Sequence, residues 1–259
     1  MPENIFEFRN VSFGYKKDVQ VLKNISLCIP AGKITALIGP NGCGKTTAFA
    51  LLSKIYKPLS GEIFFRGREL SGIPRREYAR DVAAVHQYNT VPDDMTVRRL
   101  VSMGRTAYHS LFFAHATEED HRAVERALEE THTAGFAERR VKELSGGQLQ
   151  RVWLALAIAQ TGSVLLLDEI TTYLDVHYQL EILNLISSLN AAHGTTVLMV
   201  LHDVNQALRY ADNAVLMKDG GILAQGVPEQ VITEDMLRLT YGVEAKITDV
   251  RGRKICIFG

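Results

Sequence analysis

The sequence predicts an α/β fold with a mostly parallel sheet, an antiparallel β edge sheet and an inserted α-helical subdomain. Three observations predict it. Residues 5–29 alternate between apolar and polar side chains, as short antiparallel strands do. Runs of β-branched residues and leucine at 34–38, 164–167 and 196–201 are typical of buried parallel strands, and helical spacing follows each of them. Between 89 and 161 the spacing is helical, which indicates an insertion into the α/β core.

The elements of the first part of the chain follow in order. Turn residues at 14–18 and 30–32 divide the alternating segment into short strands. The buried strand at 34–38 runs directly into a glycine-rich turn, after which apolar residues at helical spacing predict a helix over 46–55. Residues 61–66 predict one more strand.

The later elements are predicted in the same way. Thr117 is a good N-cap ahead of three acidic residues, so a helix should begin there. Helices are expected at 176–189 and 205–211, after the two later buried strands. Residues 245–250 and 254–258 resemble a short hairpin packed on the core, to which no chemistry is assigned.

The composition favours a soluble protein. Apolar residues make up 46% of the 259 residues, and Lys+Arg and Asp+Glu are both 29. This neutral charge argues against nucleic acid as a partner. No apolar run approaches the ~18 residues of a membrane span, and no leader segment is indicated, so a membrane role requires a partner. Cys28, Cys43 and Cys256 fit neither a disulfide framework nor a zinc site.

Residues 39–46 read Gly-Pro-Asn-Gly-Cys-Gly-Lys-Thr, which fits the phosphate-binding pattern G-x-x-x-x-G-K-[ST] between a strand and a helix. Glycines let the backbone turn its N–H groups toward phosphate oxygens, and the helix adds its positive N-terminal end. Lys45 is expected to reach the β- and γ-phosphates, and the Thr46 hydroxyl to bind Mg²⁺. The expected nucleotide contacts here are Gly39, Pro40, Asn41, Gly42, Cys43, Gly44, Lys45, Thr46 and Thr47.

Two acids end the buried strand at 164–167. Asp168 is placed to hold Mg²⁺, and Glu169 to orient or deprotonate an attacking water. Apolar runs followed by acids are common at strand ends, so this pattern carries weight only together with the phosphate loop.

A second anion site is predicted at residues 144–148, Leu-Ser-Gly-Gly-Gln. Ser145 is a good N-cap, and Gly146 and Gly147 expose backbone N–H groups at the start of a helix. One nucleotide does not need two phosphate sites so far apart in one chain. Two chains arranged head to tail would need them, because each nucleotide would then be closed from both sides.

The order of these motifs resembles the nucleotide-binding subunit of an ATP-binding-cassette (ABC) transporter over residues 5–235. The resemblance implies a P-loop NTPase core of the RecA-like type, ATP and Mg²⁺ as cofactors, and ATP hydrolysis. It assigns residues 39–46 to the Walker A loop, 144–148 to the signature and 164–168 to Walker B, with Glu169 as the catalytic glutamate.

The resemblance adds further residues. Tyr15 matches the aromatic that stacks on adenine, Gln87 the glutamine that contacts Mg²⁺ and water, and His202 the switch histidine at the γ-phosphate. Asp175 matches the D-loop at the dimer seam. Each of these three has an alternative. Tyr15 could be an aromatic residue of a surface turn, Gln87 a polar residue at a strand end, and His202 a core histidine. The implied catalytic set is Glu169, His202, Gln87 and Lys45, the metal set is Thr46, Gln87 and Asp168, and the signature contributes Ser145, Gly146, Gly147 and Gln148.

One ABC ATPase domain is therefore expected over residues 1–259. Its nucleotide-binding α/β core should comprise 1–87 and 162–240, and the helical subdomain with the signature should comprise 88–161. Residues 241–259 should form a short C-terminal extension.

Residues 169–175 and 201–212 resemble the importer group that handles ferric siderophores, haem and cobalamin. This implies a homodimer bound to two integral-membrane permease subunits at the cytoplasmic face of the bacterial inner (plasma) membrane, served by an extracytoplasmic substrate-binding protein. Iron–siderophore uptake is the first expectation, and haem or cobalamin uptake is the alternative.

Three other classes compete with this reading. A soluble, non-transport ABC ATPase of DNA repair or translation is disfavoured by the single cassette, the neutral charge and the lack of a long coiled-coil insertion. A monomeric P-loop phosphotransferase would have no use for the signature. A non-hydrolysing subunit would not need the complete set of Lys45, Asp168, Glu169 and His202.

Some residues depart from the pattern or lie outside it. Ile170 stands where the family usually has proline, so the backbone beyond Glu169 is expected to be less rigid. Cys43 lies within the phosphate loop, so a thiol alkylator should inhibit hydrolysis and ATP should protect. The lobe histidines fit no tight metal-ligand spacing and are expected on a solvated helical face: His109, His115, His121 and His132.

Overall fold

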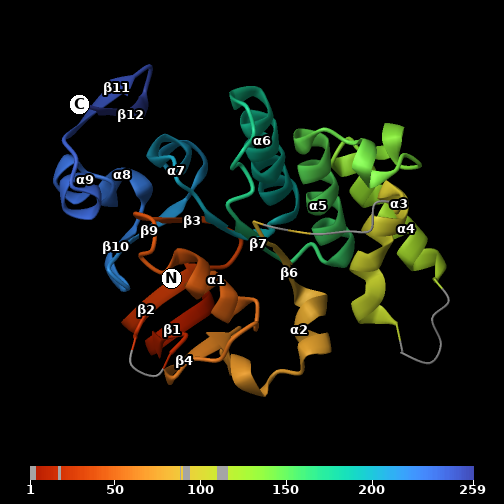
Figure 1. The fold of residues 1–259 in the computed structure, drawn as a ribbon, viewed down its shortest axis with the longest axis horizontal. Helices are drawn as coiled ribbons and strands as arrows, with labels where there is room; N and C mark the ends of the chain where they lie inside the picture. The colour runs from red at the N-terminus through yellow and green to blue at the C-terminus, as the bar shows by residue number, and fades with distance from the viewer. Residues whose placement is uncertain (1–3, 17–18, 88, 90–93, 110–115) are drawn as a thin grey trace. The chain divides into compact units, whose positions relative to one another are not determined.

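The computed structural model describes residues 4–16, 19–87, 89, 94–109 and 116–259 (Figure 1). Residues 17 and 18 of the predicted turn, and His115, lie outside the described residues. Contacts group the chain into a first unit, Met1–Ile73 with Thr196–Gly259, and a second unit, Pro74–Thr195.

The first unit contains the antiparallel sheet that the alternating sequence predicts. Its strands are β1 (Asn4–Phe13), β2 (Leu22–Pro30), β4 (Ser60–Phe65) and β5 (Arg68–Glu69), in the order β2-β1-β4-β5. Every neighbouring pair is antiparallel. The apolar side chains of β1 and β2 are buried, and the predicted antiparallel strands are confirmed. The alternation is interrupted in β1, where register shifts leave adjacent residues such as Ile5 and Phe6 both buried.

A run of buried parallel strands forms the centre of the same unit. β3 (Ile34–Ile38) lies between β8 (Thr196–Val200) and β9 (Asn213–Lys218), and both pairs are parallel. β10 (Gly221–Gly226) adds to β9 in the antiparallel sense and was not predicted from the sequence, and neither was β9. β3 runs into the glycine-rich turn and then into α1 (Lys45–Leu52), as expected.

The helix predicted over 46–55 is wrong at its C-terminal end. α1 stops at Leu52, because Lys54 takes a left-handed backbone conformation with φ of 57°. The Lys54 ammonium donates to the carbonyl of Leu70 at 2.7 Å, which holds this reversal in place. The apolar spacing that predicted a longer helix continues past Leu52, but the residues there form a turn.

The end of the chain completes the first unit with three short helices and a hairpin. These elements are α7 (Val204–Tyr210), α8 (Pro228–Val231), α9 (Glu234–Tyr241), β11 (Ala245–Val250) and β12 (Arg253–Phe258). β11 and β12 pair antiparallel, which confirms the predicted hairpin. The amide of Asn205 on α7 exchanges two hydrogen bonds with the backbone of Cys256, at 3.1 and 2.8 Å, and fastens the hairpin to that helix.

The second unit is mostly helical. Its main elements are α2 (Arg75–Asp81), β6 (Val82–Val85), α3 (Val97–Ser102), α4 (Glu118–Glu130), α5 (Gly146–Gln160), β7 (Val164–Asp168) and α6 (Val176–His193). β6 and β7 are parallel, and α3 and α4 pack against α5 (Figure 1). The sequence did not predict α2 or β6. No described helix is both long enough and apolar enough to cross a bilayer.

A buried ion pair fixes the start of α4. Thr117 caps this helix through a reciprocal capping box with Asp120, which confirms the predicted N-cap. The Asp120 carboxylate also accepts from Arg105 Nε at 2.8 Å, and both side chains are largely buried. Burial alone would raise the pKa of Asp120, but hydrogen bonds from Thr117 and Arg105 outweigh it and lower that pKa from 3.8 to about 2.

Replacing Asp120 by Asn should destabilise the fold by about 3 kcal/mol, because Arg105 would stay buried without its counter-charge. Since the pKa of Asp120 is lowered on folding, this stabilisation is present above pH ~4 and is lost as the pH falls toward 2. Urea unfolding at neutral and acidic pH measures both effects. Glu119→Gln is the matched control. Glu119 is exposed, and its carboxylate lies 4.0 Å from Arg105 Nη2, so this pair should contribute little to stability. Equal losses in the two variants would contradict this assignment.

Candidate nucleotide site

The predicted site residues divide between the two units. The first unit holds Tyr15, the residues from Gly39 to Thr47, and His202. The second unit holds Gln87, Ser145, Gly146, Gly147, Gln148, Asp168, Glu169 and Asp175.

The glycine-rich loop between β3 and α1 has the geometry of a phosphate cradle. Gly39, Gly42 and Gly44 have φ of 155°, 78° and 107°, a region that favours glycine. A Cβ at Gly39 would lie 2.2 Å from the carbonyl oxygen of Met217, so no side chain fits there. No side chain caps α1 at Gly44, which leaves the first N–H groups of the helix for a ligand.

Lys45 is buried and folds back onto this loop. Its ammonium donates to the carbonyls of Gly39 at 2.7 Å and Pro40 at 3.1 Å. These neutral acceptors hold the cation at the loop, where phosphate oxygens would be stronger acceptors. Thr46, which follows it, is exposed and can offer its hydroxyl to a cation.

An aromatic cluster flanks the start of α1. Tyr15 is 58% exposed, and its hydroxyl lies 3.1 Å from Thr47 Oγ1. The ring meets Phe13 and Tyr56 edge to face, with centroids 5.2 and 5.5 Å apart. Tyr56 was missed from the sequence, since only the fold brings it beside Tyr15. The exposed ring provides a flat apolar surface near the loop.

His202 lies just beyond β8, at the same end of the sheet as the glycine-rich loop. Parallel pairing places Val200 opposite Leu37, and the N–H of Leu201 donates to the Leu37 carbonyl at 3.1 Å. The side chain of His202 is exposed, which excludes the alternative of a buried core histidine.

Within the second unit, Gln87 and Glu169 meet directly. β6 and β7 are parallel neighbours, so the residues after each strand lie at one edge. Gln87 Nε2 donates to Glu169 Oε2 at 2.6 Å. Glu169 has φ of 53°, an uncommon conformation for a non-glycine residue that turns the chain away after the strand. Asp168 is buried at the end of β7, with 2% of its surface exposed.

Ser145 caps α5, as predicted, and this cap is part of a reciprocal box with Gln148 at 3.3 and 3.1 Å. Gly146 is exposed, but Gly147 is buried, and a Cβ there would lie 2.6 Å from the Tyr178 ring. The two glycines therefore differ: one leaves an open surface and the other allows close packing on α6. Asp175 caps α6 by accepting from the Tyr178 N–H at 3.1 Å, a structural role that the sequence did not predict.

The sequence model of the ABC transporter family matches residues 22–172 of this chain. The chain belongs to the ABC transporter family. It is 41% identical over 256 residues to the iron(3+)-hydroxamate import ATP-binding protein FhuC of Bacillus subtilis (strain 168), over 98% of this chain and 94% of that protein. It is 39% identical over 251 residues to the ferric enterobactin transport ATP-binding protein FepC of Escherichia coli (strain K12), over 96% and 92% of the two chains.

Solved structures agree on the fold of this ABC ATPase. A metal-chelate type ABC transporter in an inward-facing conformation matches with a TM-score of 0.85 and 25% identity, over 99% of this chain and 97% of that one. The dimeric bacterial ABC transporter cassette MJ0796 matches with a TM-score of 0.75 and 27% identity, over 86% and 98%. The predicted P-loop NTPase fold and the ATP-binding, ATPase character of the chain are confirmed.

The residues proposed for Mg²⁺ fit that ion by their chemistry. Thr46, Gln87 and Asp168 offer a hydroxyl, an amide carbonyl and a carboxylate, all of them hard oxygen donors. Mg²⁺ is usually held by one or two such protein groups together with phosphate oxygens and water. A bound Mg²⁺ would neutralise charge that develops on the phosphates.

Burial changes the expectation for Cys43 in this ABC ATPase. Only 2% of its surface is exposed, and burial raises the pKa of its thiol, an effect that Lys45 offsets only in part. Burial raises the pKa of the Cys28 thiol as well, so the order depends on access: alkylation should be slower at the buried Cys43 than at the partly exposed Cys28. Peptide-resolved alkylation over a pH series measures this order, and Cys43→Ala controls for loss of hydrolysis through other thiols. Faster modification of Cys43 than of Cys28 would show that the loop opens readily.

Ile170 and the histidines of the predicted helical subdomain show no sign of a site of their own. Ile170 is buried, and the turn around it is closed by a hydrogen bond from the Thr172 N–H to the Glu169 carbonyl at 3.0 Å. His109 Nε2 lies 3.2 Å from Asp120 Oδ2, and its side chain is only 21% exposed, so His109 is partly buried against α4 and not on the predicted solvated helical face. Among the described residues, no three His, Cys, Asp or Glu side chains gather as metal ligands.

Proposed function

We propose that this chain is the ATP-hydrolysing subunit of an importer for ferric siderophores. The observation that carries the proposal is similarity along nearly the whole chain to two ATP-binding proteins named for iron–chelate uptake, FhuC and FepC. Relatives named as import ATP-binding proteins support membrane permease subunits as its partners. The proposed assembly is a homodimer on two permease subunits at the cytoplasmic face of the bacterial membrane, with an extracytoplasmic substrate-binding protein.

The proposed catalytic site is shared between two copies. Lys45, Thr46 and Asp168 of one copy hold ATP and Mg²⁺, while Ser145 and Gly146 of the other close over the γ-phosphate. The dimeric state of a related cassette supports this arrangement. So does the cap at Ser145, which places an exposed hydroxyl and glycine at the start of a helix. Gly147 contributes by letting α5 approach Tyr178.

The chemistry proposed for this site is in-line attack by water. Glu169 orients or deprotonates that water, and His202 contacts the γ-phosphate. Tyr15 stacks on adenine, and Asp175 lies at the seam between copies. Gln87 senses the permease, and its hydrogen bond to Glu169 supports a direct link from this sensor to the catalytic base. Residues 88–161 act as the helical subdomain and 241–259 as the C-terminal extension.

Uptake in proteoliposomes tests the cargo. The chain is reconstituted with its co-purified permease and binding protein, and ATP-dependent accumulation of ⁵⁵Fe-hydroxamate siderophore, haem and cobalamin is compared. We expect siderophore uptake well above the other two, and none with the Lys45→Ala chain. Preferential uptake of haem or cobalamin would contradict the proposal that the cargo is a ferric siderophore. ATPase activity stimulated by RNA or DNA and independent of any permease would favour the soluble, non-transport alternative.

A further inference from the structure

The segment between β8 and α7 carries His202, the residue proposed to contact the γ-phosphate, and both of its ends are fixed. On one side Leu201 is buried, and its N–H donates to the Leu37 carbonyl at 3.1 Å. On the other side Asp203 caps α7 by accepting from the Asn205 N–H at 2.8 Å. His202 is exposed between these two points, so its position depends on where α7 lies.

α7 is too short to hold its orientation by itself. It has seven residues, which is about two turns, and Val204 and Ala207 are its buried residues. A helix of this length has little stability apart from its packing, so the contacts of its side chains decide where it lies. The side chain of Asn205 adds a polar contact with the C-terminal hairpin.

Asn205 binds β12 in the way that a neighbouring strand would. Its Nδ2 donates to the Cys256 carbonyl at 3.1 Å, and its Oδ1 accepts from the Cys256 N–H at 2.8 Å. β12 belongs to a two-stranded sheet, so this amide takes the place of a further strand at its edge. Cys256 is only 3% exposed, and water therefore competes weakly for these hydrogen bonds.

Two further side chains hold the hairpin, and neither belongs to α7. Glu234 of α9 accepts from the Ile247 N–H of β11 at 2.8 Å, and Lys254 of β12 donates to the Glu229 carbonyl of α8 at 2.9 Å. The hairpin is thus fixed to α8 and α9 independently of Asn205. It therefore provides a support against which Asn205 can hold α7.

We propose that Asn205 is a positioning residue for His202, with the C-terminal hairpin as its support. The two hydrogen bonds to Cys256 hold the first turn of α7, and the Asp203 cap passes this constraint to the neighbouring imidazole. Asn205 acts through His202 and contacts no reacting group itself. The inference rests on the proposed contact of His202 with the γ-phosphate, and it gives the hairpin a role in hydrolysis.

Asn205→Leu tests this inference, because it keeps the size of the side chain and removes both hydrogen bonds to Cys256. We expect kcat for ATP hydrolysis to fall about tenfold and KM for ATP to change by about twofold or less, since the phosphate loop is untouched. Phosphate release over a series of ATP concentrations gives both constants. Asn205→Asp keeps the acceptor for the Cys256 N–H and lacks the donor, so its kcat should fall by a smaller factor. Thermal unfolding checks that each variant folds, and Asn205→Asp carries the test if Asn205→Leu does not.

A second background separates positioning from a merely structural role. The His202→Ala chain lacks the imidazole, so adding Asn205→Leu should change its residual kcat by about twofold or less. A tenfold loss in both backgrounds would overturn the inference, since Asn205 would then act without His202. So would an unchanged kcat in the folded Asn205→Leu chain when His202→Ala is impaired. Normal kcat in His202→Ala would instead contradict the proposed role of His202, and this inference with it.

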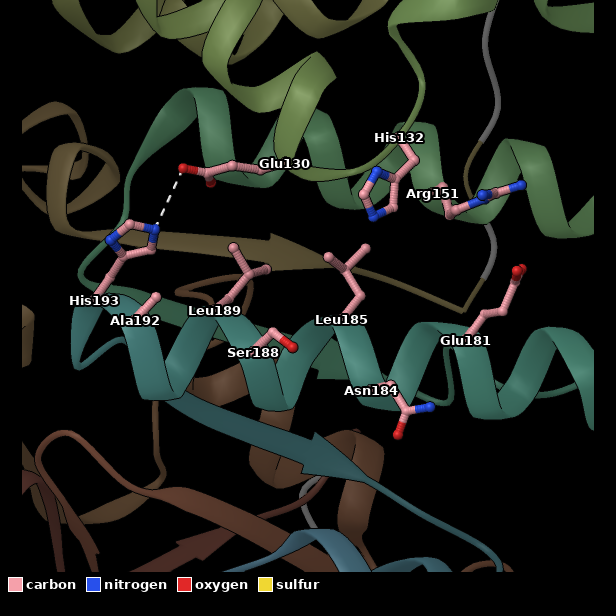
Figure 2. Close-up of a pocket in the computed structure, with 10 residues that line it drawn as sticks. All are labelled: Glu130, His132, Arg151, Glu181, Asn184, Leu185, Ser188, Leu189, Ala192 and His193. Atoms are coloured by element: carbon pink, nitrogen blue, oxygen red, sulfur yellow. Dashed lines mark ion pairs between the residues drawn. The ribbon is translucent and has the colours of Figure 1, made fainter.

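Two controls are matched to the change at Asn205. Lys254→Met removes a different anchor of the hairpin and leaves the contact with α7, so its kcat should stay within about twofold of the unaltered value. Asn184→Leu makes the same substitution at an exposed position of α6. Asn184 lies on the wall of a hollow of about 490 Å³ that none of the proposed site residues lines (Figure 2). A loss in either control equal to that of Asn205→Leu would mean that kcat does not report the contact with Cys256, and would overturn the inference.

Discussion

Glu169→Gln is expected to lower ATP hydrolysis about 10³-fold while ATP affinity stays nearly unchanged. General-base assistance contributes about 10²–10⁴-fold to such reactions, and an amide cannot accept the proton of the attacking water. The substitution keeps a side-chain oxygen that can accept from Gln87 Nε2, so the local structure should persist. Phosphate release gives the rate, and titration with a fluorescent ATP analogue gives the affinity.

The same variant should accumulate as an ATP-bound dimer, because hydrolysis is the step that reopens the pair. Size-exclusion chromatography with and without ATP measures this change. Glu119→Gln is the control, since it neutralises an exposed carboxylate in the second unit away from the proposed site. Normal turnover by Glu169→Gln would remove Glu169 from the mechanism.

Ser145→Asp should reduce hydrolysis at least about 100-fold without unfolding the chain. Aspartate caps helices as well as serine does, so the free energy of unfolding should change by only about 0.5 kcal/mol. A carboxylate facing the γ-phosphate of the partner's nucleotide would instead repel it, and a hydroxyl contact would be lost. Steady-state ATPase rates and urea unfolding separate the two effects.

Ser145→Thr provides the matched comparison, because it keeps both the hydroxyl and the cap. It should retain most of the activity. If Ser145→Asp hydrolysed ATP as fast as the unaltered chain, the cap would be only a structural feature of α5, with no role at a nucleotide.

Local signals in the sequence were enough for much of this fold. The strand at 34–38 is a continuous run rich in β-branched residues. Thr117 and Ser145 cap helices through hydrogen bonds to residues three positions along the chain. Such features depend on near neighbours, so a single sequence reveals them. One helix end was predicted wrongly: α1 ends early at a left-handed Lys54, whose ammonium binds the carbonyl of Leu70, a residue far along the chain that no local pattern indicates.

The relations that shape the site depend on distant parts of the chain. Gln87 and Glu169 are 82 positions apart, and no pattern in either segment indicates their hydrogen bond. Gly147 packs closely on Tyr178, so a glycine is required there for structural reasons that the motif alone did not suggest. Tyr56 joins Tyr15 only through the fold of the first unit. The roles of the individual site residues remain predictions that the variants above address.

Mixing two inactive chains tests the shared site most directly. Glu169→Gln and Ser145→Asp chains are combined in equal amounts, allowed to exchange subunits without ATP, and then assayed for phosphate release. Random pairing makes half of the dimers mixed, and each mixed dimer has one intact site, so about a quarter of the unaltered activity should return. A rate that stays at the level of the separate variants would contradict a catalytic site built from two copies.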